Sequence, residues 1–253
     1  MSVDKYLYRL ISKEIWDKYE IQYTDVLQTI KVNTHYYKIS ICTNCMDRTS
    51  DLKQTYEQNI LDNIDYPNIE FVLLNYNSKD DMDEWVIPLT EKYSCLKYYK
   101  TTEPKYYNMS DSRNRAFRFA TGDIINNVDA DQFTNKGFAH RINDIAHMFN
   151  TKDIVFVKSR QKNRGRIGMY KEKFLELGGY SDFQDYGYED EDLIRRAYHS
   201  GCLVVKFGGE FMRITEDHKR RNLDNYKEKD WRYTQRRNAL ISLLGISMGR
   251  YKI

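Results

Sequence analysis

The sequence predicts an α/β fold with a mostly parallel sheet and helices on both faces. Three observations support this class. From residue 37 onward, segments with the apolar pattern of strands alternate with segments of helical periodicity, and the connections between them are short. Units of this kind form right-handed crossovers, which place consecutive strands parallel. A chain of 253 residues with 41% hydrophobic residues is long enough for one such domain with a sizeable core.

The first strand and the first helix follow from two short patterns. The stretch YKISICT (residues 37–43) has the composition of a buried strand. In residues 47–60, the apolar side chains of Leu52, Tyr56 and Ile60 recur at the spacing of one helix face. We therefore expect the first strand–helix unit in these two stretches.

Two further units repeat this order. Strands are expected at residues 69–77 and 95–101, and helices at residues 80–93 and 110–121. Pro88 is expected to kink or interrupt the first of these helices, because proline lacks the N–H that a helix interior needs. Ser110 or Asp111 is expected to cap the second helix, and Gly122 to end it.

The fourth strand leads into a less regular second half, where mixed strand directions are expected. Residues 123–131 (DIINNVDAD) form an apolar run that ends in two aspartates. The elements expected beyond it are a helix at 133–149, a strand at 153–160, a strand edge, a short helix, a glycine-rich loop and an acidic helix within 166–201, a strand at 203–209, and a polar segment at 212–222.

These elements divide the chain into three parts. Residues 1–36 are expected to form a helical extension, residues 37–225 the α/β domain, and residues 226–253 a helical tail. In open sheets of this class, ligands bind beyond the carboxyl ends of the strands. Polar residues end several of the expected strands, so the site is predicted at that edge of the sheet.

Composition excludes several classes of protein. No stretch of about eighteen apolar residues is present, so no membrane-spanning helix is expected, and the charged N-terminus lacks the pattern of a secretory signal. The net charge of +3 is too small to indicate nucleic acid as a partner. One Cys-x-x-Cys pair, Cys42 and Cys45, fits ordinary thiols in a reducing compartment better than a zinc site. These features favour a cytoplasmic enzyme.

The clearest candidate site is the pair Asp129 and Asp131. Two carboxylates one residue apart at a strand end repel each other unless a cation lies near them. Oxygen ligands suit hard divalent ions such as Mg²⁺ or Mn²⁺, which keep positions open for phosphate oxygens. The plainer alternative is a solvated turn, because this triplet is common. The expected position at the edge of a parallel sheet favours the metal site.

A second acidic cluster follows a glycine-rich, aromatic loop. Gly178 and Gly179 precede this loop, and residues 186–188 (YGY) lead into four consecutive acids at residues 189–192. Acidic residues at a helix start complement the helix dipole, which is the simplest explanation. Four of them exceed what capping needs, and a carboxylate beside aromatic rings is suited to deprotonate a sugar hydroxyl.

Two basic positions have two interpretations each. His218, within EDHKRRN (216–222), either completes a metal shell or neutralises a leaving pyrophosphate, or it belongs to an exposed basic loop. Arg113, near the start of the third helix, is either a phosphate contact or a surface charge.

Together these stretches resemble nucleotide-sugar glycosyltransferases of the GT-A fold, a Rossmann-like α/β fold. YKISICTNCMDRTSDLKQT, FVLLNYNSKDD, SDSRNRAFRFATGDIINNVDADQF and GGYSDFQDYGYEDEDLIRRA occur in the order of that family and extend over about residues 37–222. The sequence is most similar to family-2 enzymes and to the β-1,4-galactosyltransferase-like group. The resemblance makes residues 37–131 the nucleotide-binding half and residues 132–225 the acceptor half.

The resemblance implies a reaction as well as a fold. A hexosyl group would pass from a UDP-sugar to a glycan, a lipid-linked glycan or another hydroxyl acceptor, with inversion at the anomeric carbon. The implied cofactor is Mn²⁺ or Mg²⁺, which would neutralise the leaving UDP as a Lewis acid.

The resemblance also assigns roles to individual positions. The implied donor-binding residues are Thr43, Asn44, Arg48, Asn75, Arg113, Asn114, Asp129 and Ala130. The implied metal ligands are Asp131, Asp129 and His218. The implied catalytic pair is Asp190, as the base, and Glu189. The implied acceptor-binding residues are Tyr186, Gly187, Tyr188 and Glu191.

Three positions depart from the family pattern. Asn75 stands where many members have an aspartate for the nucleobase, which leaves the identity of the nucleotide open. Tyr186 replaces a tryptophan, and Thr215 replaces a methionine three residues before the late histidine.

Two other functions fit the same fold class. A sugar-1-phosphate nucleotidyltransferase also has metal carboxylates, but it needs a glycine-rich loop after its first strand, and TNCMDRTSD (residues 43–51) contains no glycine. A non-catalytic glycan-binding protein would have a damaged set of acids, whereas both acidic clusters are intact here. An active glycosyltransferase is therefore the favoured prediction.

The C-terminal stretch RRNALISLLGISMGRYKI (residues 236–253) is basic and apolar. A helix of this composition can lie on an anionic membrane surface, near a lipid-linked acceptor. The alternative is a helix that packs on the core of the protein. We therefore expect that the protein can contact a membrane peripherally through this tail.

Overall fold

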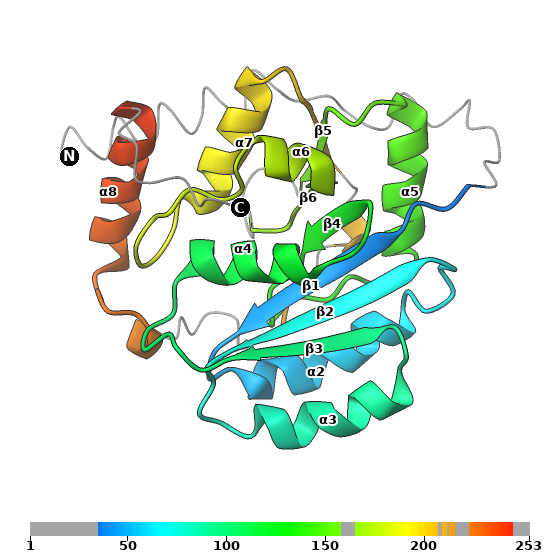
Figure 1. Cartoon of the computed structure of the whole chain (residues 1–253), viewed down its shortest axis with the longest axis horizontal. Coiled ribbons are helices and arrows are strands. Elements are labelled where there is room, and N and C mark those ends of the chain that lie inside the picture. The colour runs from blue at the N-terminus through cyan, green and yellow to red at the C-terminus, as the bar shows by residue number, and fades with distance from the viewer. Residues whose placement is uncertain (1–34, 158–164, 207–208, 212, 216–222, 245–253) are drawn as a thin grey trace.

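The computed structural model describes residues 35–157, 165–206, 209–211, 213–215 and 223–244 (Figure 1). The strands are β1 (Ile39–Cys45), β2 (Ile69–Tyr76), β3 (Leu96–Thr101), β4 (Ile124–Asn127), β5 (Ile154–Val157), β6 (Ile167–Tyr170) and β7 (Leu203–Lys206). The α-helices are α2 (Thr49–Leu61), α3 (Met82–Lys92), α4 (Met109–Phe119), α5 (Phe138–Phe149), α6 (Lys171–Glu176), α7 (Glu189–His199) and α8 (Trp231–Leu244). Two short 3₁₀ turns, η3 (Gly209–Phe211) and η5 (Leu223–Asn225), complete the described elements.

The seven strands form one sheet in the order β3-β2-β1-β4-β6-β5-β7. β1 pairs in parallel with β2 and β4, and β2 pairs in parallel with β3. β6 is antiparallel to both of its neighbours, β4 and β5, and β5 is parallel to β7. The predicted α/β class is confirmed, with a parallel first half and mixed strand directions in the second half.

Helices cover both faces of the sheet, because the strand side chains alternate between two apolar clusters. One cluster joins Ile39 and Ile41 of β1 to apolar residues of α2, α3 and α5. The other joins Cys42 of β1 to apolar residues of α4, α6 and α7. Figure 1 shows α2 and α3 on one side of the sheet and α4, α6 and α7 on the other. This arrangement leaves the carboxyl ends of the parallel strands as the open edge.

Several element boundaries differ from the sequence prediction. The helix expected from residue 133 begins at Phe138, because Asn135 and Gly137 have positive φ angles of 60° and 80°, which a helix does not allow. The helix expected to be capped by Ser110 or Asp111 is capped by Asn108, whose side chain accepts a hydrogen bond from the N–H of Asp111.

Two other expectations about helices and strands need correction. α3 continues through Pro88 to Lys92, so the proline does not interrupt this helix, whereas the expected kink stays a prediction. The fourth strand ends at Asn127, so the two aspartates after it lie in a turn and not in the strand.

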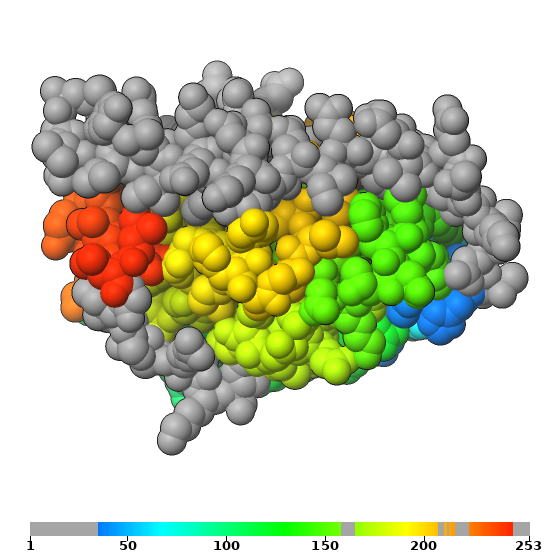
Figure 2. Space-filling view, turned by 90° about the horizontal axis from the view of Figure 1, so that it is seen from above, coloured from blue at the N-terminus to red at the C-terminus, as the bar shows by residue number. Residues whose placement is uncertain are grey.

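The expected N-terminal extension and part of the tail lie outside the described residues, as does His218. Within the tail, α8 is helical, as expected, and packs on α7 through hydrogen bonds that join Arg195 to Ser242 and Ser242 to Asp192. In the space-filling view, the red residues of α8 lie beside the yellow residues of α7 (Figure 2). No helix in the described ranges is long and apolar enough to cross a membrane.

Candidate active site

The acidic turn follows β4 at the carboxyl edge of the sheet. Asp129 accepts hydrogen bonds from the amides of Asn127 (2.8 Å) and Gln132 (2.9 Å), which fix the two oxygens of its carboxylate. The carbonyl of Asp131 accepts a hydrogen bond from the N–H of Thr215 (2.9 Å). The turn is therefore held from both sides, and the segment that contains Thr215 lies directly against it.

Hydroxyl groups fix the backbone of the same turn. Thr43 donates to the carbonyl of Val128 (2.8 Å), and Thr55 donates to the carbonyl of Ala130 (2.6 Å). Ala130 and Thr43 are both buried. The family resemblance predicts that Thr43 binds the donor, and in the structure its side chain stabilises the backbone of the acidic turn.

Two arginines neutralise the acidic turn. Arg48 donates to Asp131 (3.1 Å) and to Asp51 (2.7 Å), and Arg113 donates to Asp129 (3.0 Å). Burial opposes ionisation of Asp129, but Arg113 and the hydrogen bonds to the carboxylate hold its pKa below its usual value. Burial and the negative charge of Asp129 raise the pKa of Asp131, although Arg48 acts in the opposite direction. Ionisation is therefore less favourable for Asp131 than for Asp129, and a further cation beside Asp131 would stabilise its charged form.

Arg113 connects the acidic turn to the second acidic cluster. Its side chain is 1% exposed, and its Nη1 lies 2.5 Å from Oε1 of Glu189 at the start of α7. The other oxygen, Oε2 of Glu189, is buried and has no hydrogen-bond partner in the described structure. Burial raises the pKa of Glu189 to about 7, although Arg113 lowers it. Arg113 is therefore an internal link between two carboxylates and not a surface charge, and its predicted role in donor binding stays a prediction.

Removal of Arg113 is expected to destabilise the protein in a pH-dependent way. Arg113→Met leaves the Glu189 carboxylate buried without a cation, a change that typically costs about 3–5 kcal/mol. Without Arg113, the folded-state pKa of Glu189 lies still further above its unfolded value. The variant is then most stable at low pH, where Glu189 is protonated, and loses stability as pH rises through the folded-state pKa.

Urea unfolding at pH 5.5 and at pH 8 measures this effect. The stability difference between wild type and Arg113→Met is expected to be larger at pH 8. The matched control is Arg118→Met on the same helix, where the arginine is exposed and its loss is expected to cost less than about 1 kcal/mol. An equal loss at both pH values would show that Glu189 does not depend on Arg113.

The four acids at the start of α7 have different environments. Asp192 accepts hydrogen bonds from Ser181 (2.6 Å), Ser242 (2.6 Å) and Arg196 (2.8 Å), so it stabilises the packing around α7. Glu189 and Glu191 are buried, whereas Asp190 is only partly buried. Oδ1 of Asp190 accepts a hydrogen bond from the N–H of Glu191 (2.8 Å). Asp190 is therefore the acid of this cluster with the greatest access to a ligand.

Two asparagines predicted to bind the donor have structural partners. Asn44 is buried and accepts hydrogen bonds from the hydroxyls of Tyr107 and Ser112. Asn114 donates to the carbonyl of Tyr180 and accepts from its N–H, both at 2.9 Å. This pair of bonds fixes the turn that follows Gly178 and Gly179. The structure therefore places both amides in the support of the site.

The end of β2 has a carboxylate that the sequence analysis did not identify. Asn75 donates to Tyr98 (2.8 Å) and to Asp83 of α3 (3.1 Å). Asp83 also pairs with Lys100 of β3. Because Asn75 replaces an aspartate of the family pattern, the acid at this strand end comes from the next helix. A carboxylate eight residues away gives no local signal in the sequence.

The aromatic loop before α7 presents one of its two tyrosine rings. Tyr186 is partly buried, and its ring lies 5.6 Å from that of Tyr226 and 6.2 Å from that of Trp231. Gly187 has a φ angle of 90°, which favours glycine. Tyr188 is buried in a small cluster on the inner side of α8. Of the four expected acceptor residues, Gly187, Tyr188 and Glu191 are thus buried, and Tyr186 is partly exposed.

Two residues that contact the acidic turn or its partners, Gly165 and Arg166, were not identified in the sequence analysis. Arg166 is completely buried, donates to Gln132 (3.0 Å) and to the carbonyl of Phe133 (3.0 Å), and burial lowers its pKa to about 10. Gly165 lies against the Arg113–Asp129 pair, and an added Cβ would approach Arg113 Nη2 to 2.4 Å. These two residues lie in the stretch RGRIG (164–168), which matches neither helical nor strand spacing and therefore gave no clear prediction.

The residues of the acidic turn fit a divalent metal. Asp129 and Asp131 supply oxygen donors only. Burial and the charge of Asp129 raise the pKa of Asp131, so a bound cation would stabilise its ionised form. Within the described parts of the chain, no group of three His, Cys, Asp or Glu side chains forms a complete metal shell. Such an incomplete set is typical of Mg²⁺ and Mn²⁺ sites that substrate phosphates complete.

The mixed seven-stranded sheet, with helices on both faces, has the GT-A fold of glycosyltransferases. The chain belongs to glycosyl transferase family 2, since the model of that family matches residues 40–189, more than half of the chain. The resemblance to family-2 enzymes is thereby confirmed, and the resemblance to the β-1,4-galactosyltransferase-like group stays a prediction. No match was found among curated proteins.

Three solved structures are similar to this chain in fold. The mannosyltransferase PcManGT from Pyrobaculum calidifontis, in complex with GDP-Man and Mn²⁺, has a TM-score of 0.63 and 15% identity over 85% of this chain and 66% of its own. GalNAc-T7 with UDP, GalNAc and Mn²⁺ has a TM-score of 0.59 and 14% identity over 69% of this chain and 43% of its own. S. aureus TarS 1-349 has a TM-score of 0.58 and 15% identity over 69% of this chain and 59% of its own. The chain thus spans 43% to 66% of the length of these structures.

Proposed function

We propose that the protein transfers a hexosyl group from a nucleoside diphosphate sugar, with UDP as the favoured nucleotide, to a hydroxyl group of a glycan or lipid-linked glycan. The observation that carries this proposal is the Arg113 link between Asp129 and Glu189. It holds an oxygen-only metal site and a partly buried carboxylate, Asp190, in one rigid arrangement. Two of the structural neighbours hold a nucleotide with Mn²⁺, which supports the same class of donor and cofactor.

Each group of residues has a proposed task. Asp129 and Asp131 hold the metal, which supplies Lewis-acid chemistry to the diphosphate leaving group when bound. Arg48 pairs with Asp131 in the free protein and is placed to contact a diphosphate beside that aspartate. His218, outside the described residues, stays a proposed third ligand.

Asp190 is the proposed general base. It takes the proton from the acceptor hydroxyl, whose oxygen attacks the anomeric carbon on the face opposite the nucleotide. The bond to the nucleoside diphosphate breaks, so the sugar is transferred with inversion. Glu189 positions this helix start through Arg113, and Tyr186 and Gly187 form the proposed approach for the acceptor.

The test of this function is a panel of UDP- and GDP-sugars incubated with the full chain and Mn²⁺. Release of nucleotide from one donor, and none in excess chelator, is the expected result. A glycan-binding protein of the same fold would bind a sugar without releasing nucleotide. A nucleotidyltransferase would form pyrophosphate from a sugar phosphate and a nucleoside triphosphate, and the same assay detects that product.

We also propose that the outer face of α8 contacts an anionic membrane. Tyr233, Leu240 and Leu244 are 54%, 46% and 70% exposed, and Arg236 lies between them in the sequence. An amphipathic helix with basic and apolar residues binds the headgroup region of such membranes. Truncation at residue 235 would not test this, because it removes Asn238, whose amide donates to the carbonyl of Gly187 (2.9 Å).

Substitution of the exposed leucines tests membrane contact without this damage. The double variant Leu240→Gln, Leu244→Gln is expected to reduce flotation with phosphatidylserine vesicles about tenfold or more, since each buried leucine contributes about 1.5–3 kcal/mol. The matched control is Leu61→Gln at the end of α2, where the leucine is 51% exposed. Equal flotation of wild type and the double variant would remove the proposal.

A further inference from the structure

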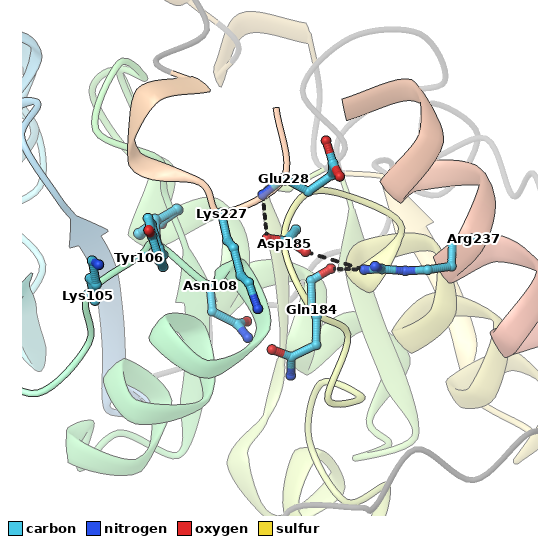
Figure 3. A pocket seen from close by; sticks show the side chains of 9 residues that line it. Lys105, Tyr106, Asn108, Gln184, Asp185, Lys227, Glu228 and Arg237 are labelled. Atoms are coloured by element: carbon cyan, nitrogen blue, oxygen red, sulfur yellow. Dashed lines mark hydrogen bonds and ion pairs between the residues drawn. The ribbon is translucent and has the colours of Figure 1, made fainter. Parts of the chain in front are cut away.

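A polar pocket of about 550 Å³ lies between three separate segments of the chain (Figure 3). Lys105, Tyr106 and Asn108 form one wall, just before α4. Gln184 and Asp185, in the loop before α7, form the opposite wall. The segment between η5 and α8 and the side chain of Arg237 complete the lining.

Both walls belong to elements that the Arg113 link joins. Asn108 is the N-cap of α4, the helix that contains Arg113. Gln184 lies in the loop that leads into α7, where Arg113 pairs with Glu189 and where Asp190 follows. The pocket is therefore fixed relative to the proposed base by the same buried ion pair. A molecule bound there therefore has a defined position relative to α7, the helix that contains Asp190.

The two acidic side chains of the pocket are occupied by partners within the protein. Asp185 accepts a hydrogen bond from the N–H of Glu228 (3.1 Å) and lies 3.6 Å from the guanidinium of Arg237. Oε1 of Glu228 accepts from the N–H of Asp230 (2.9 Å), and its carboxylate points away from the interior of the pocket in Figure 3. Both carboxylates thus have partners other than Lys105 and Lys227, the two lysines that line the pocket.

Lys105 and Lys227 provide the positive charge that faces the pocket. In the described part of the chain, neither ammonium group has a carboxylate partner. Figure 3 shows Lys227 pointing toward the amides of Asn108 and Gln184 across the pocket. Asn108 uses its oxygen for the helix cap, so its N–H₂ group stays available as a donor. The pocket thus offers cationic and neutral donors that converge on one point.

A hydrocarbon face and a hydroxyl acceptor accompany these donors. Tyr106 is 38% exposed, and an aromatic ring of this kind packs on the C–H face of a sugar. The amide nitrogen of Gln184 donates to Asp182 (3.0 Å), which leaves its oxygen to accept from a hydroxyl. The combination suits a sugar that has a negatively charged substituent, because the exposed ammonium groups of Lys105 and Lys227 attract an anion more strongly than a neutral sugar.

We infer that this pocket binds an anionic group, a phosphate or a carboxylate, of the sugar acceptor. Lys227 and Asn108 contact the anion, Lys105 adds long-range attraction, and Tyr106 supports the attached sugar ring. The role as acceptor site rests on the proposed function, whereas the binding of an anionic sugar does not.

Binding is tested first without any donor. Glucose 6-phosphate, glucuronate and glucose are titrated into the full chain, with binding followed by NMR chemical shifts. Both charged probes are expected to bind more tightly than glucose, and Lys227→Gln is expected to weaken their binding about tenfold or more, because a hydrogen bond to a charged group contributes about 1.5–3 kcal/mol. The control is Lys97→Gln, an exposed lysine of β3 that does not line the pocket.

The two charged probes also separate the sources of the anion. A preference for glucose 6-phosphate assigns a phosphorylated acceptor, and a preference for glucuronate assigns a uronic acid. Equal affinity for glucose and the charged probes would overturn the inference, as would equal losses in Lys227→Gln and Lys97→Gln. Displacement of the probes by UDP would also overturn it, because the pocket would then belong to the donor.

A transfer assay distinguishes this inference from the proposed function. Lys227→Gln is expected to raise the acceptor KM for a charged acceptor about tenfold, with the rate of donor hydrolysis unchanged. If wild type releases no nucleotide from any donor, the proposed function fails while the binding result still stands. If donor hydrolysis is normal and charged and neutral acceptors are used equally by both proteins, the inference fails and the proposed function stands.

Discussion

Asp190→Asn is expected to lower the rate of sugar transfer by about 10²–10⁴-fold, because an amide does not accept the proton of the acceptor hydroxyl. The fold should survive this change. Oδ1 of Asp190 accepts the N–H of Glu191 at the start of α7, and the amide oxygen of asparagine can accept the same hydrogen bond. Donor affinity should stay nearly unchanged, since the acidic turn and the ends of β1 and β2 belong to other elements.

The measurement combines donor binding by calorimetry with product formation. Glu189→Gln is the comparison variant, because Glu189 contributes to the structure through Arg113. It is expected to lower the melting temperature more than Asp190→Asn does and to reduce transfer less. Transfer by Asp190→Asn at a rate near that of wild type would show that the base lies elsewhere. Loss of donor binding would place Asp190 in the donor site, and unfolding would return it to a helix-capping role.

The four acids of α7 show the limit of the sequence in distinguishing a carboxylate available for catalysis from carboxylates that stabilise the fold. The run YEDED predicted a helix start, and α7 begins at Glu189 as expected. The pattern could not distinguish its four acids, because their difference is one of burial and partners. Asp192 is held by Ser181 and Ser242, and Ser242 is 50 residues away in the chain. Only the packing of α8 on α7 reveals which carboxylate stays accessible.

Arg113 is the clearest case of a role that sequence patterns miss. The motif SDSRNRAF predicted its position near the start of a helix, and α4 confirms that helix. Its partners are Asp129, sixteen residues away, and Glu189, 76 residues away. Spacing along the chain says nothing about such pairs, since the sheet order brings them together. The strands themselves were predictable because each is a short apolar run followed by polar turn residues.

The segment between the acidic turn and α5 shows a second limit. Helical periodicity predicted a helix from residue 133, but Thr134 bonds to Asn59, and Asn135 and Gly137 adopt positive φ angles. These contacts hold an irregular segment that pairs with residues 213–215, since Gln132 bridges to Ile214. The periodicity was correct for α5, and tertiary hydrogen bonds determined where that helix begins.

Asp131→Asn is expected to reduce metal-dependent release of nucleotide by at least about 10²-fold, because loss of the charged ligand removes several kcal/mol of leaving-group stabilisation. The folded structure should tolerate the change. An asparagine oxygen accepts the hydrogen bond from Arg48, and Arg48 keeps Asp51 as its second partner. Reduced Mn²⁺ affinity, measured by electron paramagnetic resonance without any donor, is the accompanying expected result.

The stability of Asp131→Asn shows whether Asp131 serves as a metal ligand or as a residue that stabilises the fold. Burial and Asp129 raise the pKa of Asp131, so its ionised form destabilises the folded state as pH rises through that pKa. Asparagine removes this penalty, and the melting temperature at pH 8 without metal should equal or exceed that of wild type. The control is Asp123→Asn at the other end of β4, where the carboxylate accepts the N–H of Lys38 and should not affect Mn²⁺ affinity. Full turnover of wild type in excess chelator would contradict the metal site, and a large fall in melting temperature in Asp131→Asn would make Asp131 the structural partner of Arg48 instead.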